Sequence, residues 1–123
     1  SALEILSDYV ETVRSQTVPV DKLLLRRRIS KQIEDYEQFN DGLAALLQLR
    51  REGKEVHPGE AIRYVITDGD SRDERTRVMV EALADDDVQS DSEAYVDLLF
   101  RATETMLIPL GYTREKLLEN IAK

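Results

Sequence analysis

The sequence predicts an α+β fold, mainly helical with a small strand component, in a single domain over residues 1–123. Apolar residues recur at helical spacing in four stretches, residues 2–15, 41–52, 90–107 and 113–121. Strand-like alternation is confined to residues 61–67, with a brief extended piece at residues 78–80. A chain of this length buries roughly two thirds of its unfolded surface on folding, so it needs no disulfide to build a core. It contains no Cys.

The first predicted helix runs from Ala2 to Ser15. Its apolar stripe falls at positions i, i+3, i+7 and i+10, occupied by Leu3, Leu6, Val10 and Val13. Ile5 and Tyr9 widen this stripe, and we expect the whole of it to lie in the core. The helix ends before Pro19, because the residue that precedes a proline is pushed out of the helical region.

Residues 20–29 have two interpretations. Helical spacing of the residues that follow favours one helix starting at Asp21, on the positions Ile29, Ile33, Tyr36 and Phe39. A packed leucine run at residues 23–25, followed by three arginines, instead permits a strand from Leu23 to Ile29 and then a helical turn to Tyr36. Periodicity does not decide between them in so short a run.

The middle of the chain carries clear start and stop signals. A helix from Asp41 to Glu52 has Asp41 as its expected N-cap and Gly53 at the place of a C-terminal cap. The polar turn His57-Pro58-Gly59 leads into the strand of residues 61–67. Residues 68–77 form a predicted polar loop.

The longest predicted helix runs from Ser90 to Leu107, with Ser90 and Glu93 as a capping box. Its expected inner face comprises Tyr95, Leu98, Leu99, Ala102 and Met106. Pro109 stops this helix, and Thr113 caps a last one. The inward positions of that last helix are Leu117, Leu118 and Ile121.

Charge is distributed unevenly along the chain. The net charge is −8, and residues 68–97 alone carry 11 acidic and three basic residues, so the remainder is neutral. Arg outnumbers Lys by 12 to 5. An acidic, Lys-poor surface fits either a protein adapted to high salt, where screening suppresses self-repulsion, or an ordinary solvated acidic face. No apolar run reaches the ~18 residues of a membrane span, and we expect a cytoplasmic protein.

One segment is purely basic. Between Lys22 and Lys31 there are five basic residues and no acidic one. These cations either protect an exposed strand edge from pairing or bind an anion. In the second interpretation Arg26, Arg28 and Lys31 face phosphates, and a second rank consists of Arg50, Arg51, Lys54 and Arg63.

The sequence contains no recognisable active site and no predicted metal site. Asp68 and Asp70 stand at i and i+2, but Arg72 and Met79 occupy positions where a calcium loop needs a ligand and a Glu. His57 is the only histidine and has no Cys to share a metal site with. Phosphate-loop, dinucleotide and nucleophile-elbow motifs are all missing.

Read in order, several short motifs resemble the C-terminal thumb domain of family B DNA polymerases of archaeal type. They are Asp21-Lys22-Leu23, Ile29-Ser30-Lys31, Glu34-Asp35-Tyr36, Arg51-Glu52-Gly53, Val56-His57-Pro58-Gly59, Ile62-Arg63-Tyr64-Val65-Ile66 and Leu110-Gly111-Tyr112. The resemblance covers residues 2–119. It implies a mainly helical domain of about four to five helices with a small antiparallel sheet, in which residues 24–28 form a strand.

The resemblance also implies a function. Thumb domains of this family grip the primer–template duplex through its phosphates and minor groove, which suits a contact blind to sequence. Lys31 then sits at a basic position of the family, Tyr36 and Tyr64 at aromatic positions, and His57 where an arginine is common. The expected DNA-binding set is therefore Arg26, Arg28, Lys31, Tyr36, Arg50, Arg51, His57, Arg63 and Tyr64.

Further expectations concern partners and catalysis. The palm domain of the same polymerase would carry the catalytic carboxylates and the Mg²⁺, so this segment needs no cofactor and polymerises nothing alone. The acidic residues 68–97 should face away from the duplex. The chain departs from the family at Asp41-Gly42, where Pro-His is usual, and lacks the sliding-clamp tail. A free-standing acidic protein–protein interaction module is the alternative.

Overall fold

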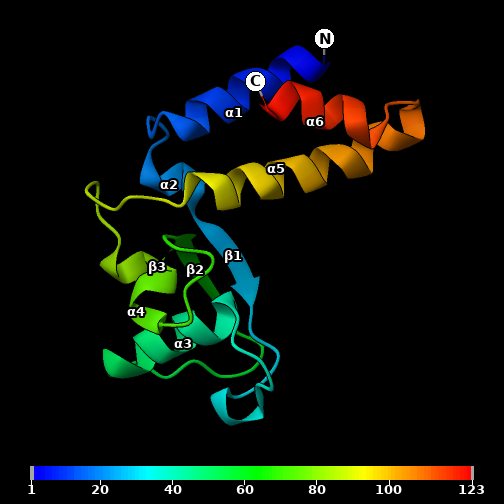
Figure 1. The fold of residues 1–123 in the computed structure, drawn as a ribbon. Coiled ribbons are helices and arrows are strands. Elements are labelled where there is room, and N and C mark those ends of the chain that lie inside the picture. The colour runs from blue at the N-terminus through cyan, green and yellow to red at the C-terminus, as the bar shows by residue number, and fades with distance from the viewer. Residues whose placement is uncertain (1, 123) are drawn as a thin grey trace. The chain divides into compact units, whose positions relative to one another are not determined.

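The protein was analysed as a computed structural model that describes residues 2–122, with side chains at residues 3–116, 118 and 119. The chain divides into two compact units, one made of Ser1–Val18 with Ser92–Lys123 and the other of Pro19–Asp91 (Figure 1). The first unit is helical. The second combines helices with an antiparallel sheet, so the expected α+β class is confirmed.

Three strands form the sheet of the second unit, in the order β1-β2-β3. They are β1 (Leu25–Arg28), β2 (Ala61–Ile66) and β3 (Val78–Val80), and both pairings are antiparallel. β1 pairs with the first half of β2, with Leu25 opposite Tyr64. β3 pairs with the second half, with Val80 also opposite Tyr64.

The ambiguous basic segment is a strand, as the family resemblance implies. A single helical turn, α2 (Val20–Leu23), follows Pro19, and the backbone becomes extended at Leu24. Beyond β1 the ladder continues, because the Ile29 amide donates to the Glu60 carbonyl at 2.8 Å. The Gly59 amide donates back to the Ile29 carbonyl, at 2.7 Å. Gly59 has a φ of +102°, a value that favours glycine and lets the turn close.

Helix α3 (Asp41–Arg51) packs on one face of this sheet, against β2 and β3. Its buried side includes Ala44, Ala45 and Leu46. The expected N-cap was wrong by one residue: the Asn40 side chain accepts the Leu43 amide at 2.9 Å, and Asp41 is the first helical residue. Gly53, with a φ of +77°, confirms the expected C-terminal stop.

A buried amide joins α3 to the strand beyond it. Gln48 is only 5% exposed, and its Nε2 donates to the carbonyl oxygens of Glu74 and Val78. Its Oε1 accepts the Val80 amide at 3.0 Å. The connection before β3 contains the short helix α4 (Glu74–Arg77), and the 3-10 turn η2 (Glu81–Leu83) follows β3 directly.

The first unit consists of α1 (Ala2–Arg14), α5 (Ser92–Leu107), the 3-10 turn η3 (Ile108–Leu110) and α6 (Arg114–Ala122). Its core cluster contains Leu6, Val10, Val96, Phe100 and Leu107. Arg14 donates to both carboxylate oxygens of Glu93, at 2.9 and 3.2 Å. The expected cap of the last helix is confirmed, because the Thr113 hydroxyl accepts the Lys116 amide at 3.2 Å.

Several expected core positions in this unit are exposed. Ile5 and Tyr9 are 58% and 60% exposed, so they do not extend the buried stripe of α1. On α5, Leu98, Ala102 and Met106 are exposed, and Val96 and Phe100 are buried in their place.

Two further expectations about the helices of this unit were tested. Helix α5 begins at Ser92 rather than beside Ser90. In the last helix Leu118 is exposed, while Leu117 and Ile121 lie outside the described side chains. Within residues 2–122, no helix combines the length and the apolar character that a membrane span requires.

Candidate nucleic-acid interface

The exposed face of the sheet carries a cluster of arginines. Side chains alternate along β1, so Arg26 and Arg28 point to one face, while Leu25 and Arg27 point to the other. Arg63 of β2 stands directly opposite Arg26 in the antiparallel register and shares its face. All three side chains are exposed. We call Arg26, Arg28 and Arg63 the arginine face.

The arginine face carries more positive than negative charge. Like charges directly opposite each other on neighbouring strands are destabilising, and Arg26 and Arg63 are such a pair. Glu81 relieves part of the repulsion, with an oxygen 3.6 Å from Arg63 Nη1. Among the described residues, no ion pair is formed by Arg26 or Arg28. The face therefore offers guanidinium groups to an external anion, and phosphate is one that arginine binds well.

Arg27 belongs to the opposite, α3-facing side. A Cβ placed on Gly42 would lie 3.2 Å from Arg27 Cδ, so the arginine passes close over the first turn of α3. The Tyr64 side chain lies on this side too, close enough to Arg27 for the guanidinium to act on its pKa. Burial raises the pKa of Tyr64 and the Asp41 carboxylate adds to the effect, whereas Arg27 and Arg77 oppose it. Tyr64 is 5% exposed, which removes it from the proposed contact surface.

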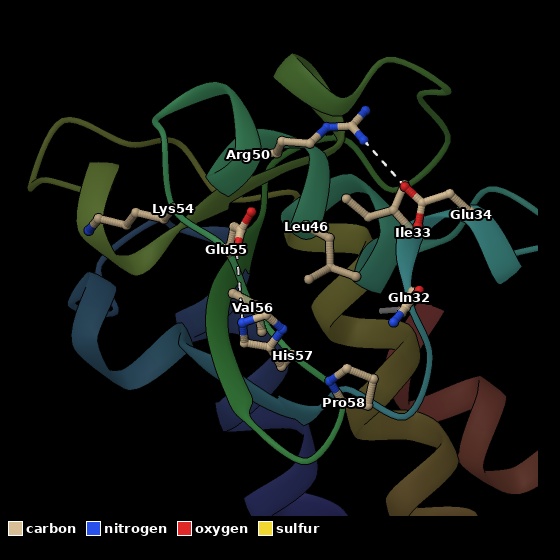
Figure 2. Close-up of a pocket in the computed structure, with 10 residues that line it drawn as sticks. All are labelled: Gln32, Ile33, Glu34, Leu46, Arg50, Lys54, Glu55, Val56, His57 and Pro58. Atoms are coloured by element: carbon tan, nitrogen blue, oxygen red, sulfur yellow. Dashed lines mark ion pairs between the residues drawn. The ribbon is translucent and has the colours of Figure 1, made fainter.

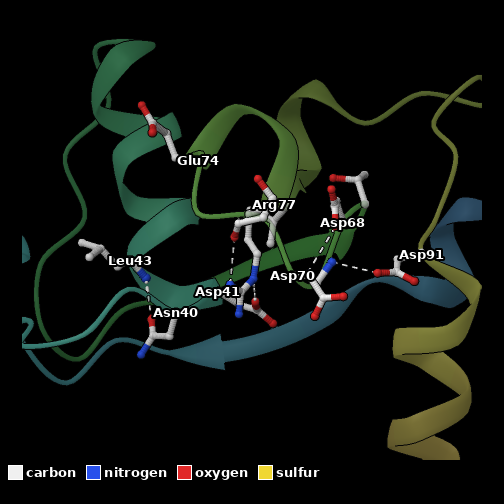
Figure 3. A network of polar contacts seen from close by, with 12 residues as sticks. Asn40, Asp41, Leu43, Asp68, Asp70, Glu74, Arg77 and Asp91 are labelled. Carbon is white, nitrogen blue, oxygen red and sulfur yellow. Dashed lines mark hydrogen bonds and ion pairs between the residues drawn. The ribbon is translucent and has the colours of Figure 1, made fainter.

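A polar network anchors the loop between β2 and β3 to the start of α3 (Figure 3). Arg77 Nε donates to Asp41 Oδ1 at 2.6 Å, and its Nη1 donates to the Ser71 carbonyl at 3.0 Å. The same guanidinium lies over the Phe39 ring, 5.6 Å from the centroid. Both charged side chains are about four-fifths buried. Arg77 therefore serves the fold and is unavailable to a ligand.

Residues after β1 form a second cationic region. Lys31 lies over the ring of Tyr36, 5.1 Å from its centroid, so two residues of the expected DNA-binding set contact each other. The 3-10 turn η1 (Ile33–Asp35) separates them. A cation held over an aromatic ring is restricted in its motion, which lowers the entropy lost when it binds an anion.

Next to η1 lies a cavity of about 240 Å³ with Leu46 and Val56 in its lining (Figure 2). Its basic side chains are Arg50, Lys54 and His57. Arg50 lies 3.9 Å from Glu34 and His57 lies 3.9 Å from Glu55, both in loose, exposed contacts. The cavity brings together several residues that are far apart in sequence. Its charges are mixed, so it is a weaker anion site than the arginine face.

The acidic segment of residues 68–97 is not separate from the cationic residues. Arg51 is paired with Glu74, and Arg63 is paired with Glu81, so two members of the expected DNA-binding set each have a carboxylate partner from this segment. How the acidic segment lies relative to a duplex stays a prediction.

The two aspartates that resemble a metal motif have structural roles. Asp68 Oδ1 accepts the Asp70 amide at 3.3 Å, in a local turn. Asp91 Oδ2 accepts the Gly69 amide at 2.7 Å and ties the loop down. Over the part of the chain that the structure describes, no group of three or more His, Cys, Asp or Glu side chains is placed to hold a metal ion.

Sequence reasoning missed the residues that join α3 to β3 and to the connection that precedes β3. Gln48 and Arg77 make their contacts with residues 30 and 36 positions away. No local motif marks such pairs. The one usable signal was the polar Gln48 among the apolar residues of α3, since a polar residue on a core-facing side needs buried partners.

Comparison with known proteins agrees with this fold. The sequence model of the family described as "DNA polymerase family B" matches residues 1–110. A DNA polymerase of Pyrococcus horikoshii is 28% identical over 117 residues, which cover 94% of this chain and 10% of the relative. The DNA polymerase alpha catalytic subunit of Dictyostelium discoideum is 32% identical over 100 residues, or 76% of this chain and 7% of that protein.

A solved structure shares the fold. The family B DNA polymerase from Pyrobaculum calidifontis superposes with a TM-score of 0.72, at 23% identity, over 89% of this chain and 14% of that one. The chain thus spans about a tenth of the length of the relatives it matches. Because the family match covers most of its residues, the chain belongs to DNA polymerase family B.

Proposed function

We propose that this chain is the thumb of a family B DNA polymerase and holds the primer–template duplex through phosphate contacts. The observation that carries the proposal is the arginine face, on which three exposed arginines share one side of a sheet and form, among the described residues, one ion pair, that of Arg63 with Glu81. A polymerase must hold every sequence it copies. Backbone contacts by Arg and Lys meet this need, because they position a duplex without reading its bases.

Local charge outweighs the net charge of −8 in this proposal. Charges more than about 10 Å apart are largely screened at 0.1 M salt, so distant carboxylates repel a bound phosphate only weakly. The three arginines and Lys31 would make up to four phosphate contacts. Each contact contributes about −0.9 to the slope of log affinity against log salt, which gives a slope of roughly −3 to −4. Binding by the chain alone should be weak and strongly salt-dependent.

Secondary contacts would come from the residues beside η1. Arg50, Lys54 and His57 border one cavity. Arg50 and His57 each lie 3.9 Å from a carboxylate, and Lys54 forms no ion pair with the described residues. A phosphate approaching Arg50 would have to replace only a loose contact with Glu34. Arg51 is a poorer candidate because Glu74 holds it.

Catalysis would belong to other parts of such a polymerase. The palm domain would supply the catalytic carboxylates and hold the Mg²⁺ that the reaction uses. The residues here do not fit that ion, because Asp68 Oδ1 accepts the Asp70 amide in a turn and, among the described residues, no third ligand joins the two aspartates. We expect no nucleotide incorporation by this chain alone.

The test is a titration of a fluorescently labelled DNA duplex at low and at moderate salt. The variant that combines Arg26→Ala, Arg28→Ala and Lys31→Ala removes the cations whose binding role the sequence predicts. We expect wild type to bind at low salt, to lose affinity as salt rises, and to bind at least about tenfold more tightly than the variant, because each lost phosphate contact costs affinity.

A matched control removes the same amount of charge elsewhere. The variant Arg72→Ala, Arg75→Ala and Arg101→Ala also loses three exposed arginines, and we expect it to bind close to wild type. Equal losses in both variants would mean that only net charge matters. No wild-type binding at low salt would refute the proposal and favour an acidic protein–protein interaction module.

A further inference from the structure

Helix α5 has apolar residues on two sides. One side packs in the core of its unit through Val96, Phe100 and Leu107. The second side is exposed and carries Leu98, Ala102 and Met106. A helix that is apolar on both sides is normally buried between two layers. Within its own unit, other helices cover only one of these two sides of α5.

The exposed side of α5 borders an apolar groove shared with α1. Leu99, Thr103 and Met106 of α5 line the groove together with Ile5 and Tyr9 of α1, around a cavity of about 310 Å³. The groove's outer residues are widely open to solvent, with Met106 at 71% and Tyr9 at 60% exposed. Single exposed apolar residues are ordinary, but a contiguous groove of them on two helices marks an interaction surface.

We propose that this groove binds an amphipathic helix of the same polymerase polypeptide, from outside residues 1–123. A groove between two helices with a flexible methionine suits an apolar helix face, because methionine adapts its shape to what it packs against. The origin of that helix follows from the relatives, of which this chain matches only about a tenth. The proposal depends on the chain being part of a longer polymerase and is independent of DNA binding.

Charge indicates what flanks the apolar face of the bound helix. Asp8 is exposed and directly precedes Tyr9, an exposed residue of the groove. The α1 rim therefore carries an acidic side chain. A helix with Lys or Arg beside its apolar stripe would complement this rim, since opposite charges at the edge of an interface orient the partners.

The two methionines of the chain provide the test. Met79 lies partly buried in β3, in the other unit, whereas Met106 is exposed in the groove. Hydrogen peroxide converts accessible methionine to the sulfoxide, and peptide mass spectrometry follows each residue separately. The rates are compared between this chain and the full polypeptide encoded by the reading frame that contains it.

In this chain we expect Met106 to oxidise faster than Met79. In the full polypeptide the Met106 rate should fall about tenfold or more, while the Met79 rate serves as the internal reference. An unchanged Met106 rate would overturn the proposal, as would a reading frame that encodes no more than these residues. If the protection of Met106 from oxidation grew with the concentration of this chain, a second copy would be the occupant of the groove, and the proposal would also be overturned.

Substitutions give a second readout. Met106→Glu should leave the thermal unfolding of this chain unchanged, because the side chain is exposed, yet lower that of the full polypeptide. Leu83→Glu is the matched control, since Leu83 is also exposed but belongs to η2 and does not line the groove. Equal effects of the two substitutions in the full polypeptide would contradict a groove-specific contact. DNA affinity is not a readout, so failure here is distinguishable from failure of the proposed function.

Discussion

Replacing Gln48 should destabilise the sheet unit strongly. The Gln48→Ala variant removes the side-chain amide that hydrogen-bonds the Val78 carbonyl and the Val80 amide. Val78 is 0% exposed and Val80 is 1% exposed, so water cannot replace these bonds. Each buried group left unpaired costs about 1–3 kcal/mol, so the loss is about 2–6 kcal/mol. The third contact, to the Glu74 carbonyl, adds less because that residue is partly exposed and water replaces the amide.

Urea unfolding followed by far-ultraviolet circular dichroism measures this loss. With a slope of about 1–3 kcal/mol per molar urea, a loss of about 4 kcal/mol lowers the midpoint by roughly 1.3–4 M. Gln38→Ala is the control, because Gln38 is exposed. A loss below about 0.5 kcal/mol in Gln48→Ala, the range of ordinary surface substitutions, would refute the role of this amide.

A charge substitution separates the hydrogen bonds from packing. Gln48→Glu keeps the acceptor for the Val80 amide but places a carboxylate against two carbonyl oxygens. Burial there raises the folded-state pKa of the introduced carboxyl above its unfolded value of about 4.3. The variant is therefore penalised most at neutral pH. Its stability gap to wild type should narrow as the pH falls toward about 4, and a gap independent of pH would contradict this reasoning.

Three further predictions concern charge. Glu81→Gln should tighten duplex binding by about 1.5- to 5-fold, because it removes the exposed ion pair with Arg63, worth about 0.2–1 kcal/mol. This gain in affinity should vanish in an Arg63→Gln background, and the control Glu52→Gln should not change the affinity. Burial raises the pKa of Tyr64 in the folded protein. Its contribution to stability is therefore complete at pH values below the unfolded-state pKa of about 10 and is lost as the pH rises further. The urea midpoints at pH 8 and pH 11 should differ less in Tyr64→Phe than in wild type. If the acidic surface is adapted to high salt, the melting temperature in 2 M KCl should exceed that in about 0.1 M KCl, and a fall would support an ordinary solvated face.

The helices of this chain were predictable where local signals mark them. Thr113 and Gly53 carry the chemistry of a helix start and stop, and both do what that chemistry predicts. The start of α3 was misjudged by one residue because Asn40 and Asp41 are both good N-caps. Only the backbone of Asn40, extended at a φ of −145°, selects it.

The inner side of α5 was not predictable in the same way. Periodicity finds apolar stripes, but α5 has two: of the expected inner face Tyr95 is buried and Leu99 packs on the core, whereas Leu98 and Met106 are exposed. Which positions are covered depends on helices far away in sequence. Tyr64 gives a related lesson: its position in a strand was right, but strand alternation places it under α3 rather than toward solvent.

The composition of the arginine face depended on register. Arg63 was expected only as a secondary contact, and the antiparallel pairing places it directly opposite Arg26. Register between strands separated by more than 30 residues follows from burial of one face, which the sequence of β1 alone does not determine. Ion pairs such as that of Arg51 with Glu74 also join distant residues, so net charge along a segment did not reveal which cations are neutralised.

The most direct measurement is a nuclear magnetic resonance titration of the arginine Nε–Hε groups with a short DNA duplex of arbitrary sequence. If the arginine face grips phosphates, the signals of Arg26, Arg28 and Arg63 should shift together, and those of Arg72 and Arg75 should stay in place. A second duplex of unrelated sequence should produce the same pattern, since phosphates are common to all sequences. Shifts confined to arginines off this face, or a pattern that changes with base sequence, would contradict the account.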